Sequence, residues 1–144
     1  MNEFISNVEV RWSDLDPNFH LRHSVYYDFG AFSRLTFFTI NGITPHVMLQ
    51  HNIGPILFRE ECIFKKEIRF EDTVTINIKL SKTRADYSRW TIVHEIFKNG
   101  DILAAIITVD GAWLDTQKRK LCIPPDIFHK TFEIISKTEN FQML

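Results

Sequence analysis

The sequence predicts an α+β fold in which a five-stranded antiparallel sheet wraps around one long helix, with a second helix near the C-terminus. Two observations support this fold class. Residues 25–40 would be apolar on nearly every side of a helix, and they stand alone between a first strand and several later ones. From about Ile56 onward, apolar and polar residues alternate as they do in strands. With 144 residues, the chain suits one domain, residues 1–144.

The first strand and the long helix are predicted from local patterns. Residues 4–12 alternate loosely between apolar and polar side chains, which indicates a half-buried strand. Ser24 can cap a helix that begins at Val25, and an Asn-Gly pair predicts its end after about Ile40. A helix with apolar side chains on nearly all sides is a buried helix. We therefore expect the sheet to curl around it.

The later strands are predicted from alternation and from turn signals. The clearest alternation lies in residues 74–80. Asn99-Gly100 is a strong hairpin signal, and the stretch after it is apolar on both faces, as in a central strand. A short helical turn within residues 43–53 and a C-terminal helix over residues 127–137 complete the prediction. The strands predicted after the long helix are residues 67–70, 74–80, 90–96 and 102–113.

The composition narrows the possible partners and compartments. The chain has 13 Phe, a bulk that must be buried in a core, in an oligomer interface or around an apolar ligand. A net charge of −1 gives no general attraction to nucleic acid or to an acidic membrane surface. No segment approaches the roughly 20 apolar residues that a membrane helix needs. Cys62 and Cys122 match no metal or redox spacing, so we expect free thiols in a reducing, cytoplasmic compartment.

The residues best suited to chemistry lie in the loop before the long helix, within the segment RWSDLDPNFHLRHSVYYDFGAFSR, residues 11–34. This loop contains the carboxylates Asp14 and Asp16 and the histidines His20 and His23. A helix N-terminus offers unpaired backbone N–H groups and a positive dipole end, which can stabilise an oxyanion. A carboxylate that faces those groups can attack a carbonyl or activate water. Acyl transfer needs that combination.

The same segment resembles the signature of the 4-hydroxybenzoyl-CoA thioesterase family of hotdog proteins. Asp16 falls on the family's catalytic aspartate. His23 falls on a position that is histidine in the branch associated with the bacterial Tol-Pal system, and Tyr26 and Arg34 fall on the family's tyrosine and arginine. Two positions differ from the family pattern. Phe19 stands where glycine is common and Ala31 where the helix often carries glutamate, and Phe19 can reshape the loop or narrow the pocket.

The resemblance covers nearly the whole chain and implies a fold and an activity. Residues 67–72 resemble the strand and turn before the family's third strand, and residues 90–115 resemble its last hairpin. The implied fold is the hotdog fold, and the implied reaction is hydrolysis of an acyl-CoA thioester. No metal and no cofactor is implied, because coenzyme A is part of the substrate. The site would lie at the interface of a homodimer or homotetramer, which also suits the apolar surface that one helix and five strands leave uncovered.

The resemblance also assigns roles to individual residues. Asp16 would attack the thioester carbonyl or activate a water molecule. Backbone N–H groups near His23 and Ser24 would hold the carbonyl oxygen, and the His23 side chain would orient the substrate or Asp16. The acyl chain would run along the helix past Tyr26 and Phe29.

Other residues have competing interpretations. Arg84 and Arg89, in a basic strand turn with Lys82, can meet the phosphates of coenzyme A, although basic turns are commonly only solvated surface. Asp28 is a rival catalytic carboxylate, but a solvated role that favours the helix dipole is the simpler interpretation. His94 alternates with apolar neighbours, which is typical of a hydrogen-bonded core histidine. Asp14 and His20 are also interpreted as structural residues.

Three functions remain open from the sequence. Hydrolysis of acyl-CoA is the main hypothesis, and hydrolysis of an acyl-ACP thioester is the first alternative. A non-catalytic module that binds acyl-CoA or lipid is an alternative of another class, favoured by the Phe-rich interior and by Phe19 and opposed by Asp16. A hotdog dehydratase is less favoured, since no matching His and acid pair is present on the expected strand and helix. The acyl group, and the choice between Asp16 as nucleophile and as general base, are not specified by the sequence.

Overall fold

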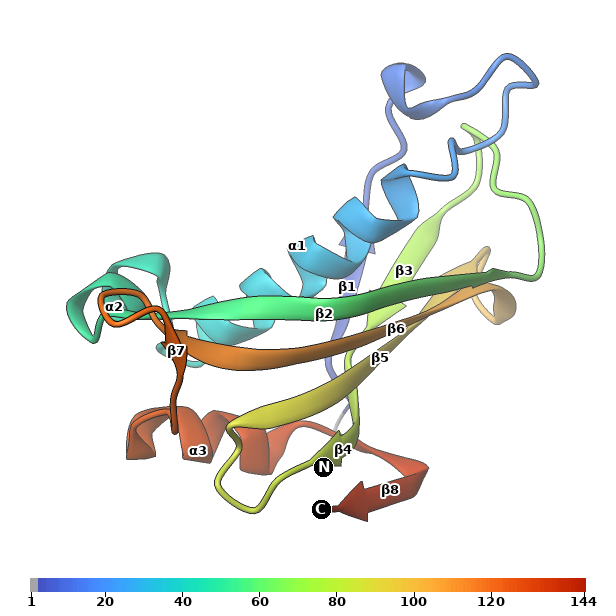
Figure 1. Ribbon diagram of the computed structural model, residues 1–144. Helices are drawn as coiled ribbons and strands as arrows, with labels where there is room; N and C mark the ends of the chain where they lie inside the picture. The colour runs from blue at the N-terminus through green and yellow to red at the C-terminus, as the bar shows by residue number, and fades with distance from the viewer. Residues whose placement is uncertain (1–2) are drawn as a thin grey trace.

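In the computed structural model, which describes residues 3–144, a strongly curved antiparallel sheet wraps around the long helix α1 (Figure 1). β5 lies in the middle of the sheet: one of its edges pairs with β3 and then β4, and the other pairs with β6. β1 extends the first side by pairing with β3, and β2 extends the second by pairing with β6. Counting β3 and β4 as one interrupted strand, these are five strands, and the predicted fold class is confirmed, although β2 (Ile53–Phe64) takes the place of the strand predicted at residues 67–70. The elements are β1 (Ile5–Val8), the short 3₁₀ helix η1 (Trp12–Asp14), α1 (Val25–Ile40), α2 (Pro45–Gln50), β2 (Ile53–Phe64), β3 (Val74–Asn77), β4 (Lys79–Thr83), β5 (Arg89–Lys98), β6 (Ile102–Asp115), β7 (Lys120–Leu121), α3 (Asp126–Ile134) and β8 (Lys137–Met143).

Helix α1 begins and ends where the sequence predicts, and it is buried on one side only. Tyr26, Phe29 and Phe37 enter the core. On the other side Phe32 is 50% exposed and Leu35 is 47% exposed. The prediction of a helix buried on nearly all sides is therefore wrong for a single chain, because the curved sheet of one protomer covers only part of the helix surface.

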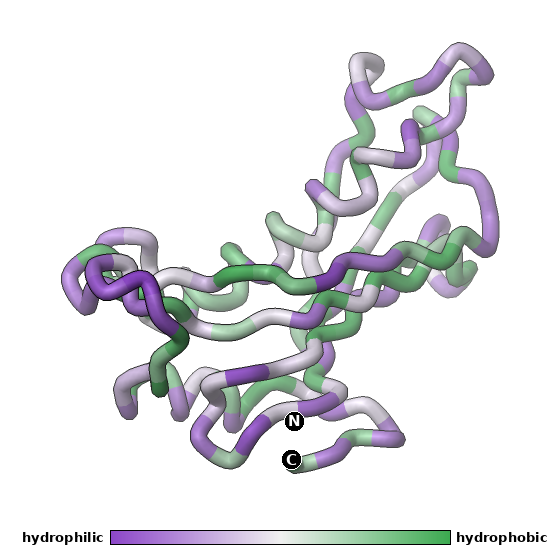
Figure 2. Tube along the Cα trace, in the orientation of Figure 1, coloured by the Kyte–Doolittle hydropathy of each residue, from purple (hydrophilic) through white to green (hydrophobic). Residues whose placement is uncertain are grey.

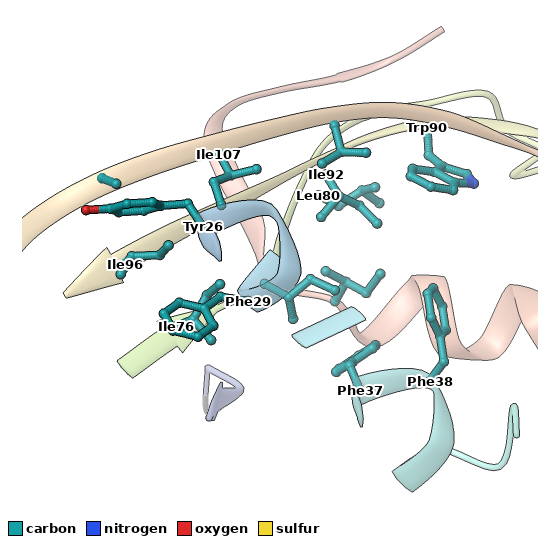
Figure 3. Close-up of a cluster of buried hydrophobic side chains, with 14 of the residues drawn as sticks. Tyr26, Phe29, Phe37, Phe38, Ile76, Leu80, Trp90, Ile92, Ile96 and Ile107 are labelled. Atoms are coloured by element: carbon teal, nitrogen blue, oxygen red, sulfur yellow. The ribbon is translucent and has the colours of Figure 1, made fainter. Parts of the chain in front are cut away.

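The hydrophobic core fills the concave side of the sheet (Figure 3). In Figure 3, Tyr26 lies at one end of the cluster, and Trp90 and Phe38 lie at the other. The second end is aromatic: Phe38 packs against Trp113 at 5.8 Å and against Phe132 of α3 at 5.7 Å between ring centroids. Helix α3 thus closes the end of the core that is far from the start of α1.

The interrupted strand has a local cause at Asn77. Residues 74–80 are predicted as one strand, but the structure divides them into β3 and β4 around Ile78. The Asn77 side-chain oxygen accepts the backbone N–H of Glu95 at 2.7 Å, in place of a regular ladder bond. The side chain therefore satisfies a backbone donor at the kink, where the sheet bends around α1.

Two other expectations need correction. Residues 67–70 form a loop with one isolated bridge at Arg69 rather than a strand. β2, which was not predicted, contains Gly54 and Pro55, and an edge strand allows this because its outer edge needs no donor from proline. The C-terminal helix ends at Ile134 instead of reaching residue 137, and residues 137–143 form β8, which runs parallel to β4.

Candidate active site

The loop before α1 holds the Asp16 carboxylate in a fixed orientation. Its Oδ1 accepts the backbone N–H groups of Asn18 at 2.9 Å and of His20 at 3.1 Å. The backbone of Asp16 also exchanges bonds with the same turn, since its N–H donates to the His20 carbonyl and its carbonyl accepts from Phe19. Among residues 3–144, no group donates a hydrogen bond to the second oxygen, Oδ2. One carboxylate oxygen is therefore anchored and the other remains available for chemistry.

Phe19 occupies a backbone conformation that glycine adopts more easily. Its φ is 64°, in the left-handed region, and its side chain is 73% exposed. The predicted departure from the family pattern thus falls at the position in this turn where a glycine would be unstrained. Phe19 does not line the cavity next to Asp16. In a single chain it therefore does not narrow this pocket.

Asp16 opens into a cavity of about 330 Å³ at the start of α1. His23 and Tyr26 line the same cavity, so the structure brings together three of the residues that the sequence singles out. Ser24 and Phe29 do not line it: Ser24 is exposed beside it, and Phe29 lines a separate cavity on another side of α1. The remaining lining residues are His20, Leu21, Phe64, Lys65, Lys66 and Glu67.

The start of α1 supplies unpaired backbone donors near this cavity. Ser24 is the N-cap residue, but its side chain makes no capping hydrogen bond. The N–H groups of His23 and Ser24 have no backbone acceptor among residues 3–144, whereas that of Val25 donates to Arg22. Together with the positive end of the helix dipole, these N–H groups favour negative charge on a bound oxygen.

Tyr26 contributes a hydroxyl that stays protonated. Burial, with smaller contributions from the nearby Cys62 and Asp16, raises the pKa of Tyr26 to about 12. Its ring packs edge-on against Phe64 at 4.9 Å. Tyr26 can therefore act as a hydrogen-bond donor but not as a base near neutral pH.

The rim of the cavity contains charged residues that sequence reasoning did not assign to the site. The Nε2 atom of His20 lies 3.2 Å from Glu67, and the pKa of Glu67 is lowered chiefly by its hydrogen bond from Arg69. The adjacent Lys65 and Lys66 follow β2 and are exposed. In the sequence, these two lysines are visible only as a Lys-Lys pair. The pair points to the site only because the fold places it beside the loop of Asp16.

The rival acids lie elsewhere. Asp14 is 2% exposed and is bound by Arg11 through its backbone N–H and its guanidinium, which lowers the pKa of Asp14. This agrees with a structural role. Asp28 is exposed and lines the separate cavity that contains Phe29, so it does not share a cavity with Asp16.

The basic turn is also distant within one chain. Arg84 and Arg89 line a third cavity, together with Lys82 and Phe58. Arg89 pairs with Ala112 of β6, whereas Phe64, at the Asp16 cavity, pairs with Ala105. Those two positions on β6 are separated by roughly 23 Å of strand.

Among residues 3–144, no cluster of three or more His, Cys, Asp or Glu side chains has the arrangement of a metal site. Within the same residues, no helix combines the length and the apolar character needed to cross a membrane.

Comparison with known proteins identifies a family over most of the chain. The family described as the thioesterase-like superfamily matches residues 10–132. No curated protein matches the chain.

Solved structures with the same fold include several enzymes. A hypothetical protein of Staphylococcus aureus in complex with CoA is similar with a TM-score of 0.86 at 16% identity, covering 99% of this chain and 88% of that one. The DHNA-CoA thioesterase of the same organism has a TM-score of 0.80 at 18% identity, covering 90% of this chain and 87% of that one. A 1,4-dihydroxy-2-naphthoyl-CoA thioesterase of Synechocystis has a TM-score of 0.81 at 13% identity, covering 92% of this chain and 97% of that one. At these identities the likeness shows the fold.

Proposed function

This chain belongs to the thioesterase-like superfamily, and on that premise we propose that it hydrolyses an acyl-CoA thioester to a free acid and CoA. Membership of the family confirms the expected resemblance and the expected enzyme class, a thioesterase. The observation that carries the proposal is the Asp16 carboxylate, anchored through Oδ1 and open at Oδ2, in one cavity with the start of α1.

The proposed chemistry uses Asp16 and the helix start together. As a general base, Asp16 takes a proton from water, the resulting hydroxide adds to the thioester carbonyl, and the C–S bond breaks as CoA leaves as a thiolate that is then protonated. As a nucleophile, Asp16 adds to the carbonyl itself, and water cleaves the resulting anhydride. In both routes the N–H groups of His23 and Ser24 hold the carbonyl oxygen as it gains negative charge. Label found in Asp16 after single-turnover hydrolysis in oxygen-18 water would establish the nucleophilic route, because only that route forms an anhydride whose Asp16 carbonyl carbon water can attack.

The side chains around Asp16 have supporting roles in the proposal. Tyr26, which stays protonated, donates a hydrogen bond to substrate or to water. His23, exposed on the cavity wall, orients the substrate. The exposed Lys65 and Lys66 attract the phosphates of CoA to the cavity mouth. Cys62 and Cys122 are free thiols, which suits the proposed cytoplasmic location.

We also propose that the enzyme is a homodimer, or a tetramer of such dimers, with two copies joined through β2. This strand has 12 residues and pairs only with β6 among residues 3–144, so its outer edge is unpaired. In Figure 2, hydrophobic stretches of β2 flank a hydrophilic middle. Antiparallel pairing of two copies about Glu60 would set Arg59 against Glu61 of the other copy and apolar residues against apolar residues. Exposed apolar edges of this length favour such pairing.

The proposed dimer also relocates the basic turn. A two-fold axis near Glu60 brings the partner's Ile56 beside Phe64, at the Asp16 cavity. The partner's Arg89 then lies three strand spacings from Phe64, roughly 14 Å away. Arg84 and Arg89 would thus meet CoA bound in the active site of the other protomer, instead of the site of their own chain.

The test of the proposed function is release of free thiol from a panel of short, long and aromatic acyl-CoAs, with matched acyl-ACP esters alongside. Turnover of CoA esters is the expected result. Turnover of the ACP esters alone would replace CoA by the protein carrier. Tight binding of acyl-CoA without release of thiol would favour the non-catalytic module and would reject the proposed hydrolysis.

A further inference from the structure

A histidine lines the same cavity as Asp16 and has no role in the hydrolysis proposed above. This residue, His20, follows Asp16 in the loop before α1. Its backbone already serves Asp16, because the N–H of His20 donates to Oδ1 of Asp16 at 3.1 Å. The side chain of His20 is 30% exposed, so water can reach its ring. The ring is therefore a free chemical group beside the catalytic carboxylate.

A carboxylate fixes the orientation of this ring. Nε2 of His20 lies 3.2 Å from Oε2 of Glu67, which lines the same cavity. The other oxygen of Glu67, Oε1, accepts hydrogen bonds from Arg69, from Nη2 at 2.9 Å and from Nε at 3.3 Å. The backbone carbonyl of Glu67 accepts a bond from Nζ of Lys98 at 2.6 Å. Arg69 and Lys98 thus hold the carboxylate that holds the imidazole.

Backbone contacts join the two segments without help from this ion pair. His20 forms an isolated antiparallel bridge with Arg69. The N–H of Leu21 donates to the carbonyl of Ile68 at 2.7 Å. The loop of Asp16 is therefore fastened to residues 68–69 by its main chain. A structural role, the simpler interpretation from the sequence, does not require an imidazole at position 20.

The contact with Glu67 determines which nitrogen of His20 is basic. An ionised carboxylate only accepts hydrogen bonds, so Nε2 carries the proton of the neutral ring and Nδ1 presents a lone pair. The hydrogen bond from Arg69 lowers the pKa of Glu67 and so keeps this carboxylate ionised. Within residues 3–144, Nδ1 of His20 makes no hydrogen bond. A histidine held in one tautomer by a carboxylate is arranged as a general base.

The nucleophilic route contains a step that needs such a base. Once Asp16 has attacked the thioester, its carboxylate is part of the anhydride and cannot remove a proton from water. A second base must then activate the water that hydrolyses the anhydride. Histidine is the side chain most often used for this purpose. His20 lies in the same cavity, and its proton-bearing nitrogen is already paired with Glu67.

We propose that His20 is the general base that hydrolyses the acyl–Asp16 anhydride, and that Glu67 is the residue that positions it. Nδ1 of His20 takes a proton from water, and the hydroxide adds to the acyl carbonyl carbon. The bond from that carbon to the Asp16 oxygen breaks, which gives the free acid and the Asp16 carboxylate. The proton on His20 returns to solvent, and the CoA thiolate released earlier takes one from solvent. The inference rests on the proposed function and selects its nucleophilic route.

The first test follows thiol release from the preferred acyl-CoA through the first turnovers. Wild type, His20→Gln and His46→Gln are compared. Gln at position 20 can still donate to Glu67, but it cannot take up a proton. His46, which is exposed on α2 and does not line this cavity, is the matched control and should behave as the wild type. His20→Gln should release about one equivalent of CoA per site in a burst and then turn over at least about a hundredfold more slowly than the wild type.

The burst distinguishes a lost base from a damaged site. Chain quenched after the burst should carry the acyl group on the peptide that contains Asp16. Steady turnover of His20→Gln within a few-fold of the wild type would overturn the assignment. Slow turnover without a burst would overturn it as well, because a damaged site slows the first step too. No thiol release by the wild type from any ester would reject the proposed function instead.

Two further variants keep the inference testable if His20→Gln does not fold. The slow phase of His20→Ala should accelerate with the concentration of added imidazole, whereas Asp16→Asn should not respond. Glu67→Gln keeps an oxygen that accepts from Nε2 but loses the negative charge, so the second phase should slow by about two- to fivefold while the first phase stays unchanged. A folded His20→Ala that ignores imidazole, or a Glu67→Gln that slows both phases equally, would overturn the inference.

Discussion

The buried contact between His94 and Arg34 predicts a specific dependence of stability on pH. Burial and, to a lesser extent, the positive charge of Arg34 together lower the pKa of His94 from 6.5 to about 3. Below pH 6.5 the unfolded chain binds a proton at His94 and the folded chain does not. Stability therefore falls as the pH falls, by about 1.4 kcal/mol per unit for this group alone. Between pH 6.5 and about pH 5, the loss from His94 should be roughly 2 kcal/mol.

The measurement is urea unfolding, followed by tryptophan fluorescence at fixed protein concentration, for the wild type and His94→Gln. Gln can donate to the Asn77 carbonyl and accept from Arg34 without titrating. The difference between the two free energies of unfolding should change by roughly 2 kcal/mol over this pH range, and it should be constant above about pH 7.5. Parallel curves across the whole range would refute the reasoning, since His94 would then bind its proton equally in the folded and unfolded states.

Two glycine substitutions test local packing and backbone strain. Gly111→Ala should destabilise the fold by about 1–3 kcal/mol in urea unfolding, because the added Cβ would overlap the buried ring of Trp90, whereas Gly54→Ala meets only ordinary contact with Thr116 and should be near neutral. Phe19→Gly should raise the free energy of unfolding by up to about 1 kcal/mol, because relief of the left-handed backbone exceeds the entropy cost of glycine. A loss of stability in Phe19→Gly would mean that the exposed ring makes contacts that outweigh the strain.

Much of the fold could be predicted from local patterns. The end of α1 follows from the Asn-Gly pair after it, and the helix begins at Val25 as predicted, although the Ser24 side chain does not cap it. The strand β8 could not be predicted in this way, since its sequence, KTENFQM, is polar. It forms because Lys137 donates to the carbonyls of Glu133 and Ile135 at 2.9 Å, which caps α3 and turns the chain toward β4.

The candidate site was predictable only where the residues lie close together in sequence. The loop of Asp16 and the start of α1 are adjacent in the chain, and the structure brings Asp16, His23 and Tyr26 to one cavity. Contacts between distant segments were not predictable. His94 was expected to be a satisfied core residue, which is confirmed, but its partner Arg34 is 60 residues away and no local pattern links them.

The catalytic assignment is tested most directly by thiol release from the preferred acyl-CoA, measured for Asp16→Asn and Asp28→Asn side by side, with the oligomeric state checked for each. Asp16→Asn should lose at least about a hundredfold in kcat, because Asn can neither attack the carbonyl nor remove a proton from water. Asp28→Asn should stay within a few-fold of the wild type, because Asp28 lines a different cavity. Turnover that survives in Asp16→Asn and disappears in Asp28→Asn would contradict the assignment and would move the chemistry to the other side of α1.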